Sequence, residues 1–392
     1  MSVVRSILLV LCGLLSVVYT NAQLPDSTRS TLKIAVFAPV YLDSAFTEDF
    51  YKLGKGSIPR YMLPGLDFYN GVMLAVDSLN KEKVPIEVLF YDTKNTATSI
   101  EELLRTDEMK NISLIISSFT TRTEVKPLAD FALANSIPLI SATYPNDAGI
   151  TANPFFVILN PTLISHIEAI YKYIRRSFPT DNITMFRRQG DVGDLIQSVF
   201  GDMNNNTPGT LLKIKTVELR DNFTSAEVLV QLDSNRQRNI VFCAAINEAF
   251  GSNLSKVLSS NKSYHATVIG MPTWDGLKDI STNLDIIYST PYNLQRTDKL
   301  STRITDLYKK KYAGRASDMV FKGYESMYRF TKLLLKYGDT LINHLSDKEY
   351  KLFHDFDIQP VKTGKESTQI NYLENKKLYF IRKKNGMVKS IN

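Results

Sequence analysis

Short apolar runs alternate with segments of helical periodicity along almost the whole chain, and this alternation limits the possible folds more than any other feature. The first strand-like run covers residues 32–38, a helical pattern follows at 68–79, and a second strand-like run covers 86–91. A strand–helix–strand order of this kind is typical of parallel sheets covered by helices on both faces. The sequence therefore predicts an α/β fold.

The same rhythm occurs twice, once in each half of the chain. Further strand-like runs in the first half lie at 112–116, 137–140 and 155–159, and a helical pattern follows at 164–174. The second half has runs at 183–186, 211–219, 240–245, 267–270 and 286–288, then helical patterns at 298–312 and 319–337, and a closing hairpin that turns at 385–386. Two similar halves predict two similar lobes.

Capping boxes indicate where two helices of the first half begin. Thr98 and Glu101 have the spacing of one capping box, and Thr121 and Glu124 have the spacing of another. We expect the second of these helices to end near Asn135.

The first residues have the pattern of a secretory signal. One positive charge at Arg5 precedes an apolar run too short to span a bilayer, and small residues precede a cut after Ala22. We expect export to a bacterial periplasm without lipid anchoring at Cys12, because Leu11 stands where a lipobox has a small residue. No later run approaches the roughly 20 apolar residues of a membrane helix, so we expect a mature chain that does not span the membrane.

The mature chain is longer than one hydrophobic core usually supports, which favours two domains. We expect a signal peptide at 1–22, lobe 1 at 23–178 and lobe 2 at 179–312. Residues 313–392 then form a recrossing helix and a C-terminal segment that completes the two lobes.

Catalytic, metal-binding and nucleic-acid-binding signatures are missing from the sequence. There is no G-x-S-x-G or H-E-x-x-H motif, the 4 histidines are far apart, and Cys243 alone remains after the signal is removed. The net charge of +7 is modest for 392 residues, and the lysines are scattered. The sequence therefore predicts a protein that is not an enzyme and that has no cofactor, metal or nucleic-acid partner.

Hydroxyl side chains follow the third and fourth strand-like runs of the first half. Ser117, Ser118 and Thr120 precede a helix, where free backbone N–H groups favour an anion. The next run ends in Ser141, and Thr143 and Tyr144 follow it. Because open α/β sheets bind ligands at the carboxyl ends of their strands, these residues are candidate ligand contacts. The alternative is that they only cap helices and turns.

Two aromatic residues of the second half are further candidates. Trp274, the only tryptophan, and Tyr292 both follow strand-like runs. Either ring would form a stacking wall for a ligand, whereas the alternative for Trp274 is a place in the hydrophobic core.

Five segments together have a recognisable order and spacing: residues 34–39, 71–80, 115–118, 137–143 and the C-terminal hairpin. They resemble the type I periplasmic binding proteins typified by the branched-chain amino-acid receptors. The resemblance extends over nearly the whole mature chain and implies two Rossmann-like lobes with parallel sheets, three crossings and a hinge-bending ligand cleft between the lobes.

The resemblance also implies roles for particular residues. In that family an amino-acid carboxylate lies against hydroxyls and amides at the positions of Ser117, Ser118, Ser141 and Thr143. An acidic residue of the second lobe holds the ammonium group in amino-acid receptors. Glu248 and Asp275 are the candidates here.

Three functional hypotheses follow. The leading one is an exported solute-binding protein that closes around a small ligand, amino-acid-like or otherwise polar or anionic, for an inner-membrane permease or a sensor. The second is an envelope protein that uses the same fold to regulate or accompany cell-wall enzymes without transport. The third, an exported hydrolase, has only scattered Asp, Glu and Ser residues in its favour.

Overall fold

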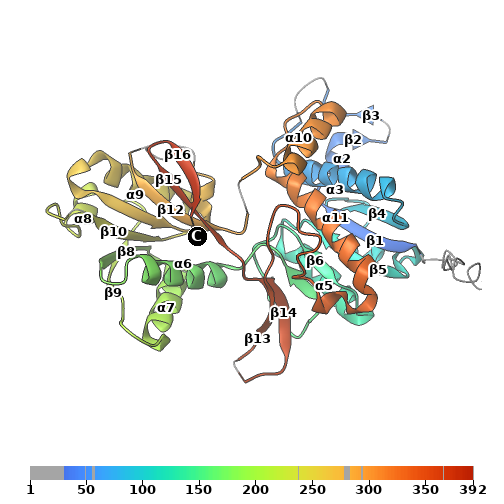
Figure 1. Cartoon of the computed structure of the whole chain (residues 1–392). Coiled ribbons are helices and arrows are strands. Elements are labelled where there is room, and N and C mark those ends of the chain that lie inside the picture. The colour runs from blue at the N-terminus through green and yellow to red at the C-terminus, as the bar shows by residue number, and fades with distance from the viewer. Residues whose placement is uncertain are drawn as a thin grey trace, which may run out of the picture.

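The computed structural model describes residues 31–48, 50–54, 58–236, 238–277, 283–292, 295–364 and 366–391. The expected signal peptide and Cys12 lie outside the described residues. Figure 1 shows the described chain as two lobes, each built on its own sheet and covered by helices.

Lobe 1 contains a seven-stranded sheet in the order β13-β14-β7-β6-β5-β1-β4. All neighbours in this order pair in parallel except β13 and β14, which form an antiparallel hairpin. The strands are β1 (Leu32–Ala38), β4 (Ile86–Asp92), β5 (Ile112–Ser117), β6 (Leu139–Ser141), β7 (Phe156–Ile158), β13 (Ile358–Lys362) and β14 (Ile370–Asn375).

Helices cover both faces of this sheet because successive residues of its strands point to opposite sides. Val36 of β1 belongs to one core with α3 (Leu63–Lys81), α10 (Lys299–Tyr312) and α11 (Asp318–Tyr337). Phe37 belongs to the core on the other face. The remaining elements of lobe 1 are α5 (Arg122–Asn135), α2 (Leu42–Ala45), β2 (Phe46–Thr47), β3 (Phe50–Tyr51), α4 (Ile100–Leu103), η1 (Asp107–Met109) and η4 (Gly338–Asn343).

Lobe 2 repeats this plan in the order β16-β15-β12-β11-β10-β8-β9. The parallel strands are β8 (Asn182–Arg188), β9 (Lys213–Leu219), β10 (Asn239–Ala244), β11 (Ala266–Gly270) and β12 (Asp285–Thr290), while β15 (Tyr379–Lys384) and β16 (Met387–Ile391) are antiparallel additions. The helices are α6 (Leu163–Ser177), α7 (Asp191–Asn206), α8 (Ser225–Leu229) and α9 (Glu248–Ser260), with short turns η2 (Lys262–Tyr264) and η3 (Pro272–Asp275). The prediction of two α/β lobes with parallel sheets is confirmed.

The chain crosses between the lobes at three places. The first crossing is residues 159–162, between β7 and α6, and the third is residues 376–378, between β14 and β15. The second follows β12 and leads to α10, and its described residues are 291–292 and 295–298.

Packing places two helices in a different lobe from the one expected. The expected boundary at residue 178 puts α6 in lobe 1, but Ile167, Ile170 and Ile174 pack in a core of lobe 2. The expected boundary at residue 312 puts α10 in lobe 2, but Ile304 and Tyr308 pack with α3 and α11 in lobe 1. Each helix belongs to the lobe against which its apolar face packs. The local sequence pattern shows that a helix has an apolar face but not which sheet that face contacts.

Hydrogen bonds fasten the first crossing to the third. Glu374 is almost fully buried, and its carboxylate accepts hydrogen bonds from the N–H of Thr162 at 2.7 Å and from the hydroxyl of Ser165 at 2.7 Å. Lys376 lies 2.6 Å from the same carboxylate, and Asn375 donates to the carbonyl of Leu159. The two crossings are therefore held together at the joint between the lobes.

His166 lies buried beside this joint. Its Nδ1 is 2.8 Å from the hydroxyl of Ser289 at the end of β12. Burial lowers the pKa of His166 to about 3, so the ring is neutral at physiological pH and serves as a hydrogen-bonding core residue.

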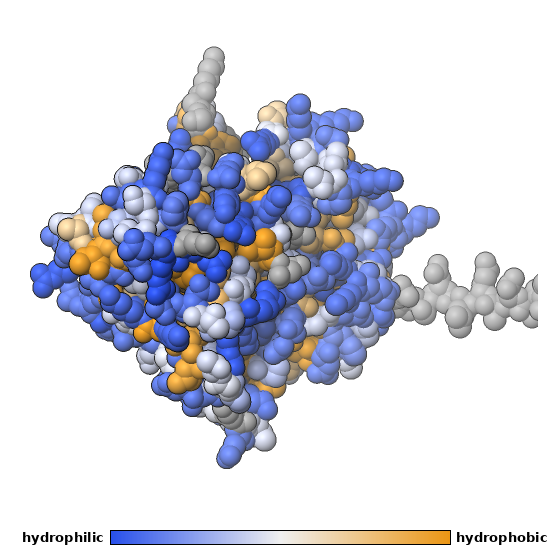
Figure 2. All heavy atoms as spheres, turned by 60° about the vertical axis from the view of Figure 1, so that its left-hand side comes forward, coloured by the Kyte–Doolittle hydropathy of each residue, from blue (hydrophilic) through white to orange (hydrophobic). Residues whose placement is uncertain are grey.

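The face of the molecule in Figure 2 is mainly hydrophilic, with hydrophobic residues in separate small groups. Within the described residues, no helix combines the length and the apolar character that crossing a bilayer requires.

Candidate functional site

Both sheets direct the carboxyl ends of their strands toward the joint. The chain leaves β7 directly into the first crossing and leaves β12 directly into the second. In lobe 1 the strands β1, β4, β5 and β6 are parallel to β7, and in lobe 2 the strands β8 to β11 are parallel to β12. The loops after these strands therefore lie at the same edge of each sheet as the crossings. Open α/β sheets bind ligands at this kind of edge.

The edge of lobe 1 contains the predicted hydroxyl residues. Ser117 of β5 and Ser141 of β6 are partners in the parallel pairing, and both are fully buried. Neither hydroxyl has a hydrogen-bond partner among the described residues. The structure therefore brings these two residues together, but below the surface of the edge.

Ser118 and Thr143 form the next layer of this edge. Their hydroxyl oxygens are 3.1 Å apart, and the side chain of Asn160 donates to the carbonyl of Thr143 at 2.7 Å. Two hydroxyls that share one hydrogen bond leave one O–H free to donate elsewhere. Thr143 and Tyr144 are half-buried and Thr120 is exposed, so these three reach the surface that the loops form.

Glu124 occupies the helix end that was expected to receive an anion. Its carboxylate accepts hydrogen bonds from the N–H groups of Thr120 at 2.7 Å and Thr121 at 3.0 Å, which confirms the predicted capping box of α5. Lys94 lies 2.5 Å from the same carboxylate. The N–H groups of Thr120 and Thr121, which lead into α5, are therefore not free for a ligand, because the Glu124 side chain already accepts hydrogen bonds from them.

The charge of Glu124 is stabilised by these contacts. Burial on its own would raise the pKa of this carboxyl, but the hydrogen bonds from Lys94, Thr120 and Thr121 lower it below its ordinary value. Glu124 is therefore ionised at neutral pH, and it forms an ion pair with Lys94 at the edge of lobe 1.

Trp274 has the core role that was the alternative in the sequence analysis. Its side chain is 1% exposed and packs in a core of lobe 2. A Cβ atom on Gly270 would lie 2.5 Å from the ring, so this glycine provides the space that the indole fills. The ring faces do not reach a surface on which a ligand could stack.

Tyr292 lies in the second crossing and packs against lobe 1. Its ring meets the ring of His354 at a centroid distance of 5.6 Å, and the Lys322 ammonium lies 3.6 Å from the Tyr292 centroid. The structure therefore places Tyr292 at the joint, away from the buried position of Trp274.

The two acidic candidates of lobe 2 follow β10 and β11. Glu248 is exposed in the first turn of α9, and its carboxylate would lie 3.7 Å from a Cβ on Gly276. Asp275 accepts a hydrogen bond from the hydroxyl of Tyr288 at 2.7 Å. Burial and this carboxylate raise the pKa of Tyr288, so its hydroxyl remains a donor.

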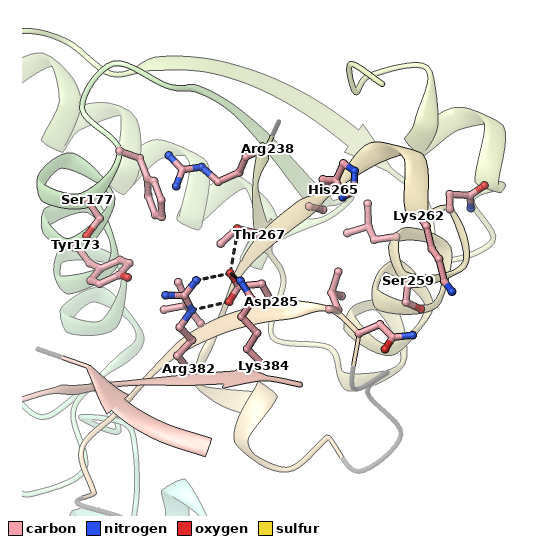
Figure 3. A pocket seen from close by; sticks show the side chains of 17 residues that line it. Tyr173, Ser177, Arg238, Ser259, Lys262, His265, Thr267, Asp285, Arg382 and Lys384 are labelled. Carbon is pink, nitrogen blue, oxygen red and sulfur yellow. Dashed lines mark hydrogen bonds and ion pairs between the residues drawn. The ribbon is translucent and has the colours of Figure 1, made fainter. Parts of the chain in front are cut away.

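A pocket of about 690 Å³ lies at the opposite edge of lobe 2, where the strands begin. Figure 3 shows Arg382, Lys384 and Lys262 around it, with Asp285 and Thr267 at its floor. This pocket was not predicted from the sequence. Its lining comes from segments between residues 173 and 384, so no local motif indicates it.

Within the described ranges, no group of three or more His, Cys, Asp and Glu side chains is arranged to hold a metal ion. Cys243 is buried in lobe 2, and burial raises the pKa of its thiol to about 12. This thiol is therefore not a reactive nucleophile at neutral pH.

The sequence matches no protein-family model and no curated protein. Solved structures resemble the whole two-lobed chain. A putative branched-chain amino-acid ABC transporter protein from Rhodospirillum rubrum has a TM-score of 0.64 and 13% identity, and the match covers 92% of this chain and 100% of that chain.

Two further structures show the same likeness. A branched-chain amino-acid ABC transporter periplasmic ligand-binding protein from Burkholderia xenovorans has a TM-score of 0.62 at 13% identity, over 92% of this chain and 94% of that chain. An ABC transporter substrate-binding protein from Desulfitobacterium hafniense, in complex with Leu, has a TM-score of 0.57 at 14% identity, and the match covers 92% of this chain and 99% of that chain. The chain therefore has the two-lobed fold of the type I periplasmic binding proteins.

Proposed function

We propose that this protein is an exported solute-binding protein that holds a small polar ligand between its lobes by hinge closure. The observation that carries the proposal is the position of the joint. Both sheets direct the carboxyl ends of their strands toward three short crossings, so a rotation at the crossings would bring the two edges together.

The chemistry of the lobe 1 edge favours a ligand with hydrogen-bonding groups. Thr143 shares one hydrogen bond with Ser118 and keeps donor or acceptor capacity, and Thr120 and Tyr144 add polar groups at the surface. Glu124 fills the nearby helix end, so a ligand carboxylate would be bound by these hydroxyls instead of by that helix end.

The acidic residues of lobe 2 would complement a ligand of amino-acid type. Glu248 and Asp275 follow neighbouring strands at the edge that faces the joint. The relatives in fold from Desulfitobacterium hafniense and Streptococcus pneumoniae were solved with Leu and isoleucine, which agrees with this ligand class. We therefore favour an amino-acid-like solute, with an inner-membrane permease or a periplasmic sensor as the partner.

The test is to purify the protein without denaturation and identify by mass spectrometry any small molecule that copurifies. We expect one ligand per chain and a rise in melting temperature when that ligand is added back. Thr143→Val should weaken its binding about tenfold, because it removes one hydrogen bond to the ligand. Thr216→Val on the exposed edge strand β9 is the matched control and should bind normally.

An empty protein that shows no thermal shift with a broad panel of solutes would contradict the proposal. In that case a pull-down from envelope extracts would test the alternative, which is a regulatory partner of cell-wall enzymes.

A further inference from the structure

The pocket at the strand-start edge of lobe 2 is separate from the proposed ligand site. It is bordered by residues that precede or begin β10, β11 and β12, whereas the proposed site lies where the parallel strands end. At about 690 Å³ it falls within the range of small-molecule sites. The lining belongs to lobe 2, so the pocket does not depend on the closure of the two lobes.

Positive charge predominates in this pocket. Arg238, Lys262, Arg382 and Lys384 line it, and Asp285 is the one carboxylate among the lining residues. Lys262 forms no ion pair within the described part of the chain, while Arg238 lies 3.2 Å from Asp181. Four cations against these two carboxylates leave an excess of two positive charges.

The ends of two helices reduce this excess but do not remove it. The carboxyl-terminal ends of α6 and α9 reach the pocket, and each carries roughly half a negative charge. Arg175 and Arg176 lie in the last turn of α6 and compensate that helix, whereas the last turn of α9 has no basic residue. An excess of about one and a half positive charges therefore remains.

The centre of the pocket is held in a fixed arrangement by Asp285. The guanidinium of Arg382 donates to one carboxylate oxygen at 2.7 Å and to the other as well, while Thr267 donates at 3.3 Å (Figure 3). Lys384 lies 3.3 Å from the same carboxylate. Only two of the five guanidinium N–H groups are used in this pair, so Arg382 keeps donors for a ligand in a preset orientation.

We infer that this pocket binds a phosphoryl group. A phosphoryl group carries a charge of about −1.5 to −2 at neutral pH and three acceptor oxygens, which matches the excess charge and the remaining donors. A single carboxylate would neutralise only part of this charge. The phosphoryl group belongs either to a soluble phosphate monoester or to a lipid headgroup that ends in a phosphate monoester, as in phosphatidic acid, since both present the same chemistry.

The test uses the purified protein and inorganic phosphate at low ionic strength, with binding measured by calorimetry. We expect saturable binding of one phosphate that weakens at least about tenfold in Lys262→Gln/Lys384→Gln, because two charge-assisted contacts are lost. The matched control is Lys309→Gln/Lys348→Gln, which removes the same charge from exposed positions of lobe 1. The control should bind phosphate as the unchanged protein does.

Two further measurements locate the phosphate-binding site and identify the kind of molecule that supplies the phosphoryl group. Thr143→Val, which alters the lobe 1 edge, should leave phosphate binding unchanged. Cosedimentation with phosphatidic acid vesicles that is lost in the Lys262/Lys384 variant would identify a lipid headgroup, and phosphate binding without vesicle binding would identify a soluble ligand. Equal phosphate binding by both lysine variants, or no saturable binding by the unchanged protein, would overturn the inference.

Discussion

The two lobes have the same strand order, but the central strand of each sheet ends in different residues. In lobe 1 the hydroxyls of Ser117 and Ser118 stand where β5 ends. In lobe 2 the corresponding strand, β10, ends in Ala244, and Ala245 follows it. Lobe 2 instead has its basic pocket where the strands begin.

This difference shows that the topology determines where loops meet but not what they bind. The same strand order places loops at both edges of each sheet, and local residues then decide which edge offers free donors or charge. Variants that make one lobe resemble the other test this separation of fold from chemistry.

The largest effect should come from a close helix contact in lobe 1. A Cβ atom on Gly323 of α11 would lie 2.2 Å from the carbonyl oxygen of Phe68 in α3, and one on Gly71 would lie 2.1 Å from that of Val320. Gly323→Ala must therefore separate the two helices. We expect it to lower the free energy of unfolding by about 3 kcal/mol, as overpacked cores do.

Gly201 in α7 of lobe 2 is the matched control for this helix contact. A Cβ on Gly201 meets no described atom within 4 Å, so Gly201→Ala should raise the free energy of unfolding by up to about 1 kcal/mol. Urea titration followed by circular dichroism measures both variants. A Gly323→Ala protein as stable as Gly201→Ala would show that the helices do not approach so closely.

The two lobes also differ in how they cap the helix that follows the central strand. Glu124 caps α5 in lobe 1 with a titratable carboxylate, while Asn247 caps α9 in lobe 2 by accepting a hydrogen bond from the N–H of Phe250 at 2.8 Å. Because contacts in the fold lower the pKa of Glu124, its ionised form stabilises the fold above the ordinary glutamate pKa. This contribution is lost as the pH falls through the lowered value.

We therefore expect Glu124→Gln to cost about 1–3 kcal/mol of unfolding free energy at pH 7, since Lys94 loses its partner. The difference from the unchanged protein should shrink as the pH falls below about 4.3. Asn247→Ala should cost about 1 kcal/mol at every pH, because an amide cap does not titrate. Thermal unfolding between pH 3 and pH 7 distinguishes the two, and a cost for Glu124→Gln that is independent of pH would rule out this role of the charge.

Most strands were predicted within a few residues, because buried parallel strands have apolar, β-branched runs that stand out locally. The hairpin β13–β14 was missed. Pro360 lies within β13, and a proline inside a run argues against a strand unless that strand is at an edge, as β13 is. The first capping box was predicted one residue early, because Thr98/Glu101 and Ser99/Glu102 overlap and only the second pair forms the box.

The candidate site was predicted in part. The positions of Ser118 and Thr143 at one edge follow from the parallel order of β5 and β6, and the structure brings their hydroxyls within 3.1 Å. The burial of Trp274 and the ion pair of Glu124 with Lys94 depend on contacts across the fold, whereas the capping box of Glu124 is local and was predicted. The basic pocket unites Arg238, Lys262 and Arg382 from distant segments, so local patterns do not reveal it.

The smallest effect is expected from a variant that makes the strand-end edge of lobe 1 more like that of lobe 2. Ser141→Ala removes a buried hydroxyl that has no partner among the described residues and leaves a methyl group, as β10 has at Ala244. Because an unpaired buried polar group destabilises the fold, we expect this variant to gain up to about 1 kcal/mol of unfolding free energy.

Thermal unfolding of the ligand-free protein measures the change. Ser289→Ala is the contrasting variant, since the Ser289 hydroxyl contacts His166 and its removal should destabilise the fold. A loss of stability in Ser141→Ala as large as that in Ser289→Ala would mean that the Ser141 hydroxyl is hydrogen-bonded in solution, and the contrast between the two edges would then be weaker than the structure indicates.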